Sequence, residues 1–578
     1  MKDTTPFEYA MWHGPAGFQT MGISAGSSRR NLAVHPQHLE NQQQGTALVA
    51  EHFLAPKEEP LHPVANTGYF PRGFLLLFIL VFPAWANCAE AWYGASLPDP
   101  APFAPELIYA QEGFSPLALE ANTYHARTED IRADELMGVV QDQMDISQRS
   151  REEGELIWGR ISGRSGGRMT TQYVLDQFRD IGLEDIHLQE VTMPPQTWPD
   201  TTALTLVAAP GTGTGSADYH FQSVMPQPRT PGTGPEGITA VLVYVGYGRD
   251  IDLSGKDLRG KGAVLRARPV QGGYSSVLGI PDKLGEAGAA FVIVIYDIAI
   301  DLQIYNPALS GTTVPTFAIA DFEGRFLEDV MARAGDTPVA ANAMVTHKTE
   351  TENLTNNVIG QITGTTDEYV IVVAHQDSYF YGAIDNATGV AALLSLARHL
   401  KNQDEKPRRT HIFVATGGHH AGGWPGTVQY VDSILGIRDK TAIVLNCEHV
   451  AATQFIEYSD IDYSVWGTRG GMLLANTEVP KFGAVLPENP AVFSLLDEAL
   501  SRYGVTLLTH PWDDARGDVY PFKDKDFPVA QIVEVGNWYH TTADIMEAVS
   551  ASGLERTTRA FAEFLHQVET RPLNELVP

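Results

Sequence analysis

The chain has 578 residues, of which 43% are hydrophobic and 19% are charged. This composition is typical of a globular protein rather than a disordered one, and the length is sufficient for two or more domains. The formal net charge is −30 at pH 7, and lysine and arginine form no dense cluster that would attract phosphates or anionic lipid, so we expect no nucleic-acid partner.

An apolar segment at residues 73–86, GFLLLFILVFPAWA, follows a basic residue and ends in a small-x-small motif. These features are typical of a signal peptide, which we place at residues 71–88. The segment is shorter than the ~20 residues that a membrane helix needs, so we expect a secreted or periplasmic protein with no stable membrane insertion after cleavage. A short membrane anchor with a cytoplasmic tail is the alternative. Residues 1–70 lack periodicity and are interpreted as a disordered extension or as the product of a misassigned upstream start.

Helical and strand patterns divide the rest of the chain into two regions. Apolar residues recur at helical spacing in residues 130–148 and 170–182. Residues 213–346 differ, because short apolar strands such as ITAVLVYVGYG, FVIVIYD and TVPTFAIA dominate there. After them, the runs YVIVVAH, HIFVAT, TAIVLN and VAQIVEV alternate with helical patterns, which favours a mostly parallel central sheet with helices on both faces. We therefore predict an α/β domain formed by residues 120–212 and 347–578, interrupted by an inserted domain.

Residues of the types that bind metal ions follow four of the predicted strands. They lie at the edge where parallel sheets bind small molecules and ions. They are His375, Asp377 and Asp385 after YVIVVA, His419 and His420 after HIFVAT, Glu448 and His449 after AIVLN, and Tyr539 and His540 after VAQIVEV. A single such histidine is more often an ordinary surface group, but repetition at successive strand ends is typical of a shared site. Imidazole and carboxylate are preferred zinc ligands, and two cysteines, Cys88 and Cys447, are too few for a closed thiolate site. The pattern predicts an open catalytic metal centre.

The segment AHQDSYFYGAIDNATGVAALLSLAR closely resembles the zinc-binding core of metallopeptidase family 28, and the later YHTTAD matches the same family. That family includes secreted bacterial aminopeptidases, glutamate carboxypeptidases and the non-enzymatic transferrin receptor. The resemblance covers about residues 130–206 and 353–568, and residues 216–346 look like the protease-associated (PA) domain that many members carry as an insertion. It implies a zinc-exopeptidase fold of the phosphorylase/hydrolase-like type.

The resemblance also implies a ligand set for one or two ions, with zinc as the default metal. His375 and Glu448 would bind one ion, His420 and His540 would bind the other, and Asp385 would bridge both. Family members most often carry an aspartate where Glu448 stands, which is a mild change that keeps the charge.

Three further assignments surround these ligands. Asp377 would be the acid that fixes the imidazole of His375. Tyr539 resembles a tyrosine that steadies the developing oxyanion in some members, and an aromatic packed under the site is the alternative. The sequence Thr541-Thr542-Ala543-Asp544 also predicts a helix start, because a threonine cap with an acid three residues later satisfies free amides.

The chain departs from the family where HIFVAT ends, because the usual pair of glutamates is replaced by His419 and His420. His420 remains a good zinc ligand. His419 stands where the general base is expected, and histidine is a common general base. Since water on a divalent ion is already acidified, the demand on that base is lower. One carboxylate fewer implies that a second ion binds more weakly.

These observations predict a metal-dependent hydrolase of peptide or related amide bonds, acting as an exopeptidase on peptide or N-acyl amino acid or amide substrates. A catalytically inactive, receptor-like or binding homologue is the alternative, and a site tuned for a non-peptide amide is a third possibility. Specificity is expected to depend on residues 461–483 and on the inserted domain. Arg469 would hold either a substrate carboxylate or a structural acid.

Overall fold

The computed structural model describes residues 92–97, 127–207, 218–267, 277–297, 302–306, 309–457, 472–478, 481–505, 507, 517–534, 536 and 538–577. The predicted extension, the signal peptide, Cys88 and Arg469 lie outside these residues. Within them, Cys447 is buried as a free thiol, and no helix combines the length and the apolar composition that a membrane span requires.

A seven-stranded sheet forms the first of two large sheets, with the strand order β1-β10-β12-β11-β13-β17-β16. Its four central strands run parallel to one another. They are β12 (Thr410–Thr416), β11 (Tyr369–His375), β13 (Thr441–Cys447) and β17 (Val529–Glu534). The strands on both sides of them pair antiparallel, and these are β1 (Glu184–Met193), β10 (Asn353–Ile362) and β16 (Lys481–Leu486). The predicted fold class is confirmed, with the parallel pairing confined to the centre of the sheet.

Helices cover both faces of this sheet because its central strands are apolar on both sides. In β11, Val370 and Val372 belong to one core cluster and Ile371 and Val373 belong to another, as the alternation of a strand requires. The first face packs under α2 (Ala133–Glu152), α3 (Ser165–Ile181), α7 (Thr388–Lys401) and α11 (Ala551–Thr570), and α9 (Pro490–Arg502) packs on α11. The second face packs under α8 (Pro425–Ser433) and α10 (Tyr520–Lys523).

The second large sheet has eight strands in the order β3-β2-β9-β5-β6-β7-β8-β4. The strands are β2 (Gln196–Val207), β3 (Tyr219–His220), β4 (Met225–Pro226), β5 (Ile238–Tyr244), β6 (Gly262–Ala267), β7 (Phe291–Tyr296), β8 (Thr316–Ile319) and β9 (Ala340–Glu350). Three helices accompany them, α4 (Asp250–Leu253), α5 (Ile280–Glu286) and α6 (Asp321–Ala334). A separate apolar core includes Phe291, Phe317 and Phe326. The assignment of this region as a PA domain, and its boundaries at residues 213 and 346, stay predictions.

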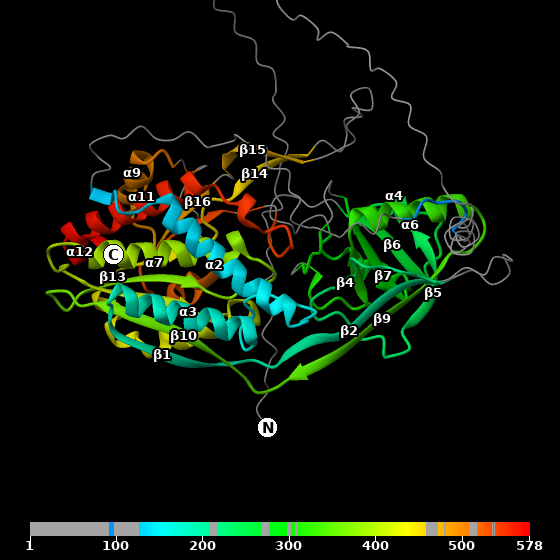
Figure 1. Ribbon diagram of the computed structural model, residues 1–578, viewed down its shortest axis with the longest axis horizontal. Coiled ribbons are helices and arrows are strands. Elements are labelled where there is room, and N and C mark those ends of the chain that lie inside the picture. The colour runs from blue at the N-terminus through cyan, green and yellow to red at the C-terminus, as the bar shows by residue number, and fades with distance from the viewer. Residues whose placement is uncertain are drawn as a thin grey trace, which may run out of the picture. The chain divides into compact units, whose positions relative to one another are not determined.

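Two paired strands connect the sheets. β1 continues into β2, β9 continues into β10, and the two chain segments pair antiparallel along both stretches. Figure 1 shows this long ribbon in cyan and green. The inserted region therefore begins and ends at neighbouring positions of one ribbon.

Candidate metal centre

The predicted site residues lie on the loops that follow the four parallel strands. β11 ends at His375, and β12 is followed by Gly417, Gly418 and the tight turn His419–Ala421. Gly418 has a φ of 81°, and a Cβ at Gly417 would lie 2.9 Å from the carbonyl oxygen of Asn356. Glycine is therefore required here, because the loop reverses in the left-handed region against the backbone of β10.

Asp385 lies at the centre of four imidazoles, of which those of His375 and His540 are buried and those of His420 and His449 are half-buried. Its Oδ1 is 3.3 Å from Nε2 of His375 and 3.2 Å from Nε2 of His449. Its Oδ2 is 3.2 Å from Nε2 of His420 and 3.1 Å from Nε2 of His540. The carboxylate thus separates two pairs of ring nitrogens, one on each oxygen.

These atoms fit divalent metal ions by two tests. Nε2 of His375, His449 and His540 and Oδ1 of Asp385 are buried without a hydrogen-bond partner, and each such atom costs ~1–3 kcal/mol if nothing satisfies it. Two ligands of a tetrahedral zinc ion, each at ~2.0–2.1 Å from the metal, lie ~3.3–3.4 Å apart. The nitrogen to oxygen distances of 3.1 to 3.3 Å match that spacing. The donor set therefore fits zinc on either side of Asp385.

Of the predicted ligands, the structure brings His375, Asp385, His420 and His540 together. Glu448 differs, because it forms a cluster with His375, His419 and Asp518. Its Oε2 accepts hydrogen bonds from Asn446 Nδ2 at 2.6 Å and from the backbone N–H of Asp518 at 3.4 Å. The neighbouring His449 occupies the Oδ1 side of Asp385, where Glu448 was expected.

A left-handed backbone turn explains the position of His449. Its φ is 50°, its N–H donates to Asn386 Oδ1 at 3.1 Å, and its Nδ1 lies 3.3 Å from the carbonyl oxygen of Glu534. The side chain amide of Asn386 also donates to the carbonyl oxygens of His375 and Cys447. Asn386 thus joins two loops of the centre. The adjacent Glu448 and His449 are both ligand types, and only the turn decides which of them faces Asp385.

Asp377 supports the centre in a different way from the expected one. The Nδ1 of His375 lies 3.0 Å from the carbonyl oxygen of Asp377 rather than being held by its carboxylate, which is 3.7 Å away. The carboxylate accepts the backbone N–H of His419 at 3.3 Å and of His420 at 3.1 Å. Burial opposes ionisation, but the interactions with His375 and His420 hold the pKa of Asp377 well below its usual range. Asp377 therefore fixes the paired-histidine turn as an anion.

His419 is held by a carboxylate that the strand pattern did not reveal. Its Nδ1 lies 3.1 Å from Oδ2 of Asp518, and its ring stacks on His375 with centroids 3.7 Å apart. Thr427 Oγ1 donates to the other oxygen of Asp518. Burial favours the neutral imidazole, but the negative charges of Asp518 and Glu448 raise the pKa of His419 above its usual value. The contact with Asp518 assigns the proton of neutral His419 to Nδ1 and leaves Nε2 as the acceptor.

Asp544 holds the loop that carries Asp385. Its Oδ1 accepts the N–H of Ile384 at 2.7 Å and its Oδ2 accepts the N–H of Asp385 at 3.0 Å. Burial raises the pKa of Asp544 to about 7. The helix predicted to start at Thr541 does not form, and the short 3-10 helix Met546–Ala548 follows instead. The acid of that motif satisfies amides of another loop rather than those of its own helix.

Arg160, between α2 and α3, is a second buried support of the centre. Its Nη1 donates to the carbonyl oxygen of Tyr381 at 2.6 Å, and its Nη2 donates to that of Gly382 at 2.9 Å. Burial lowers its pKa to about 10, so it stays cationic at neutral pH beside the carboxylates of Asp377, Asp385 and Asp544. This fixed positive charge partly balances those acids.

Tyr539 packs against the ligands through its ring. The ring stacks on His540 with centroids 3.7 Å apart and lies 5.2 Å from the ring of His449. Burial raises the pKa of its hydroxyl, which keeps it protonated. This geometry accounts for a packing role, and the oxyanion role stays a prediction.

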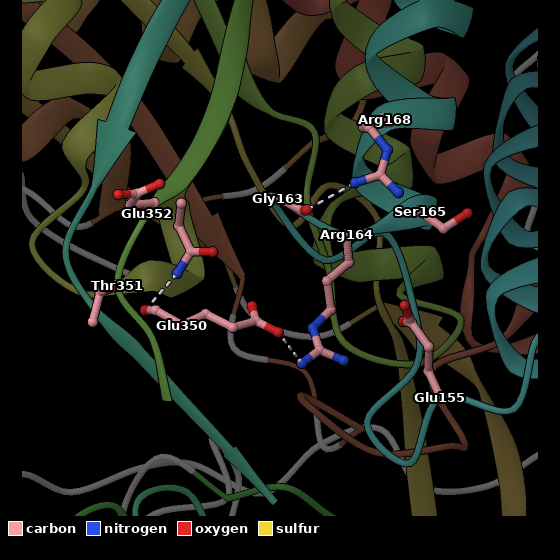
Figure 2. A pocket seen from close by; sticks show the side chains of 9 residues that line it. Glu155, Gly163, Arg164, Ser165, Arg168, Glu350, Thr351 and Glu352 are labelled. Carbon is pink, nitrogen blue, oxygen red and sulfur yellow. Dashed lines mark hydrogen bonds and ion pairs between the residues drawn. The ribbon is translucent and has the colours of Figure 1, made fainter. Parts of the chain in front are cut away.

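A polar cavity of about 540 Å³ lies at the start of α3, as Figure 2 shows. Arg164 lines it, with Nη2 3.4 Å from Oε1 of Glu350 and its guanidinium 4.5 Å from the ring centroid of Trp198. The loop before Arg164 also contacts the metal centre, because Ser162 Oγ accepts the N–H of Gly418 at 2.8 Å. The cavity wall and the turn bearing His419 are therefore joined by one hydrogen bond.

The fold is an α/β domain in which nitrogen and oxygen atoms that could hold a metal ion gather beyond the carboxyl ends of parallel strands. Residues 357–565 match the family model described as Peptidase family M28.

Three relatives with peptidase names match parts of the chain. Carboxypeptidase Q of Rattus norvegicus is 23% identical over 309 residues, across 51% of this chain and 62% of that protein. Aminopeptidase NAALADL1 of Mus musculus is 30% identical over 149 residues, across 24% of this chain and 20% of that protein. The chain thus spans less than two thirds of the length of these two relatives. Aminopeptidase YwaD of Bacillus subtilis (strain 168) is 25% identical over 427 residues, across 71% of this chain and 80% of that protein.

Two solved structures share the fold. The zinc aminopeptidase BSAP from Bacillus subtilis aligns with a TM-score of 0.55 at 19% identity, across 77% of this chain and 98% of that chain. A peptidase M28 precursor from Shewanella amazonensis SB2B aligns with a TM-score of 0.54 at 18% identity, with the same coverage. These likenesses concern the fold alone.

Proposed function

We propose that this protein is an exported, zinc-dependent exopeptidase that hydrolyses peptide or related amide bonds. The observation that carries the proposal is the Asp385 carboxylate between two pairs of imidazole Nε2 atoms, three of which are buried without a hydrogen-bond partner. His375 and His449 would hold one zinc ion on Oδ1, and His420 and His540 would hold a second on Oδ2. The names of the zinc aminopeptidase neighbour and of the aminopeptidase and carboxypeptidase relatives support the reaction class. Export rests on the sequence of residues 71–88.

Zinc, when bound, polarises a substrate carbonyl and acidifies water. The protein supplies the proton acceptor, which we assign to Nε2 of His419. Asp518 keeps the other ring nitrogen protonated, stabilises the imidazolium that forms, and remains ionised itself. His419 then returns the proton to the leaving amine. Asp377 keeps this base in place by accepting the backbone amides of the turn.

The test is metal analysis of the purified full-length chain, followed by hydrolysis of a panel of aminoacyl amides, N-acyl amino acids and dipeptides. We expect one or two zinc ions per chain and turnover that is abolished by a chelator and restored by zinc. The panel also separates amino-terminal from carboxy-terminal specificity and includes non-peptide amides. A chain that retains zinc but hydrolyses no member of the panel contradicts the enzymatic function and favours a binding homologue.

A further inference from the structure

Residues 302–306 lie within the predicted insert but contact the loop that carries the ligand His540. Ile304 and Thr541 form an antiparallel bridge. The N–H of Tyr305 donates to the carbonyl oxygen of His540 at 3.0 Å, and the N–H of Thr542 donates to the carbonyl oxygen of Gln303 at 3.0 Å. The N–H of Gln303 donates to Thr542 Oγ1 at 3.0 Å. Three hydrogen bonds thus join residues 303 and 305 to His540 and to Thr542, two residues after it.

Aromatic contacts extend this clamp to a second ligand. The ring of Tyr305 lies 5.0 Å from that of Tyr379, centroid to centroid. Tyr379 in turn lies 4.9 Å from the rings of both His420 and His540. Both histidines face Oδ2 of Asp385. The rings of Tyr305 and Tyr379 therefore pack on the Oδ2 side of this carboxylate.

The other end of the segment is fixed to the second sheet. Gln227, which follows β4, donates through Nε2 to the carbonyl oxygen of Ile304 at 3.0 Å and accepts the N–H of Asn306 at 3.0 Å. Asn306 Nδ2 donates to the hydroxyl of Tyr296, the last residue of β7, at 2.8 Å. A continuous set of hydrogen bonds therefore runs from β4 and β7 to the His540 turn.

We propose that residues 302–306 are a positioning element for the zinc ligand His540, so that the half-site of His420, His540 and Asp385 Oδ2 is complete only with the inserted region in place. His540 needs such support because its φ is 56°, a left-handed conformation that non-glycine residues keep only when their surroundings impose it. Apart from the 3.1 Å contact between its Nε2 and Asp385 Oδ2, the His540 ring has no polar partner in the described residues, so packing and the backbone position it. The inference rests on the proposed metal centre but not on catalysis.

The experiment measures zinc affinity of the full-length chain by competition with a fluorescent chelator. Thr542→Val removes the acceptor of Gln303 N–H at nearly constant shape, and Thr542→Ser is its matched control, because it keeps Oγ. Tyr305→Ala removes the ring contact with Tyr379, and Tyr305→Phe is the control that keeps it. Changing groups that orient metal ligands typically weakens metal binding ~10- to 100-fold. We expect Thr542→Val and Tyr305→Ala to weaken one of two zinc sites at least ~10-fold, while both controls stay near wild type.

The proposal is overturned if the Val and Ala variants bind two zinc ions as tightly as their controls, or if the wild-type chain binds no zinc. Far-UV circular dichroism checks that each variant folds. If one variant does not fold, the comparison at the other position, with its own control, still tests the positioning role. The double variant Thr542→Val with Tyr305→Ala is expected to lose little more than the worse single variant, because both act through one turn. A chain that shows this zinc pattern but hydrolyses nothing supports the positioning role and contradicts the proposed enzymatic function.

Discussion

Substituting Asp518 by asparagine tests whether His419 is an oriented general base. The two side chains have the same shape, but Thr427 donates to Oδ1, so the amide keeps its carbonyl there and places its NH₂ opposite Nδ1 of His419. That nitrogen must then accept, and its proton moves to Nε2, where the base is needed. General-base catalysis contributes ~10²- to 10⁴-fold, which corresponds to ~2.7–5.5 kcal/mol of barrier. We expect Asp518→Asn to lower kcat within that range with little change in KM.

The assay is steady-state kinetics on the best amide substrate with zinc content measured on the same sample. Thr427→Val is the matched control, because it removes the neighbouring hydroxyl and keeps the carboxylate, and we expect it to lower kcat less than ~10-fold. A kcat for Asp518→Asn within threefold of wild type would refute the assigned tautomer. Loss of zinc together with activity would instead assign Asp518 to metal binding and refute the positioning role.

Three other outcomes are expected. His449→Ala should remove one of two zinc ions while Glu448→Gln retains both; the opposite result by metal analysis would restore Glu448 as the ligand. His419→Ala should lower kcat ~10²- to 10⁴-fold with unchanged zinc content, and undiminished turnover would exclude it as the base. Burial lowers the pKa of His566 to about 3 in the folded chain. Since the unfolded value is ~6.5, this histidine's contribution to stability is complete above pH ~6.5 and is lost as pH falls toward 3, about 2 kcal/mol by pH 5. Urea unfolding at pH 7 and pH 5 should show a smaller loss for His566→Gln than for wild type, and equal losses would contradict the assignment.

The sequence predicted the parallel centre of the first sheet because β11, β12, β13 and β17 are apolar on both faces, a pattern that only a doubly covered strand tolerates. It did not reveal the antiparallel edges, in which β10 flanks the parallel strands on one side and β16 flanks them on the other. The candidate ligands were predicted from the same apolar runs, because each of them follows the end of such a run. His375, His420 and His540 follow runs whose ends must meet at one edge.

The rest of the centre depends on turns and on distant chain segments. Choosing between Glu448 and His449 requires the positive φ of His449, which no periodicity encodes. Asp518 follows none of the four strands predicted from the sequence, and Arg160 lies in a glycine-rich stretch, so neither stood in the strand-end pattern. Buried ionic partners of this kind are identified by what surrounds them, and local sequence carries little of that information.

The contact between residues 302–306 and the His540 turn also has a thermodynamic consequence. Binding linkage is reciprocal, so a segment that favours metal uptake must itself be favoured by the metal. Zinc would therefore increase resistance to unfolding in the eight-stranded sheet as well as in the one that supplies its ligands. One apolar cluster already includes Val292 and Val294 of β7 together with Val370 and Val372 of β11, so stabilisation at the metal centre would reach both sheets through a shared core as well as through residues 302–306.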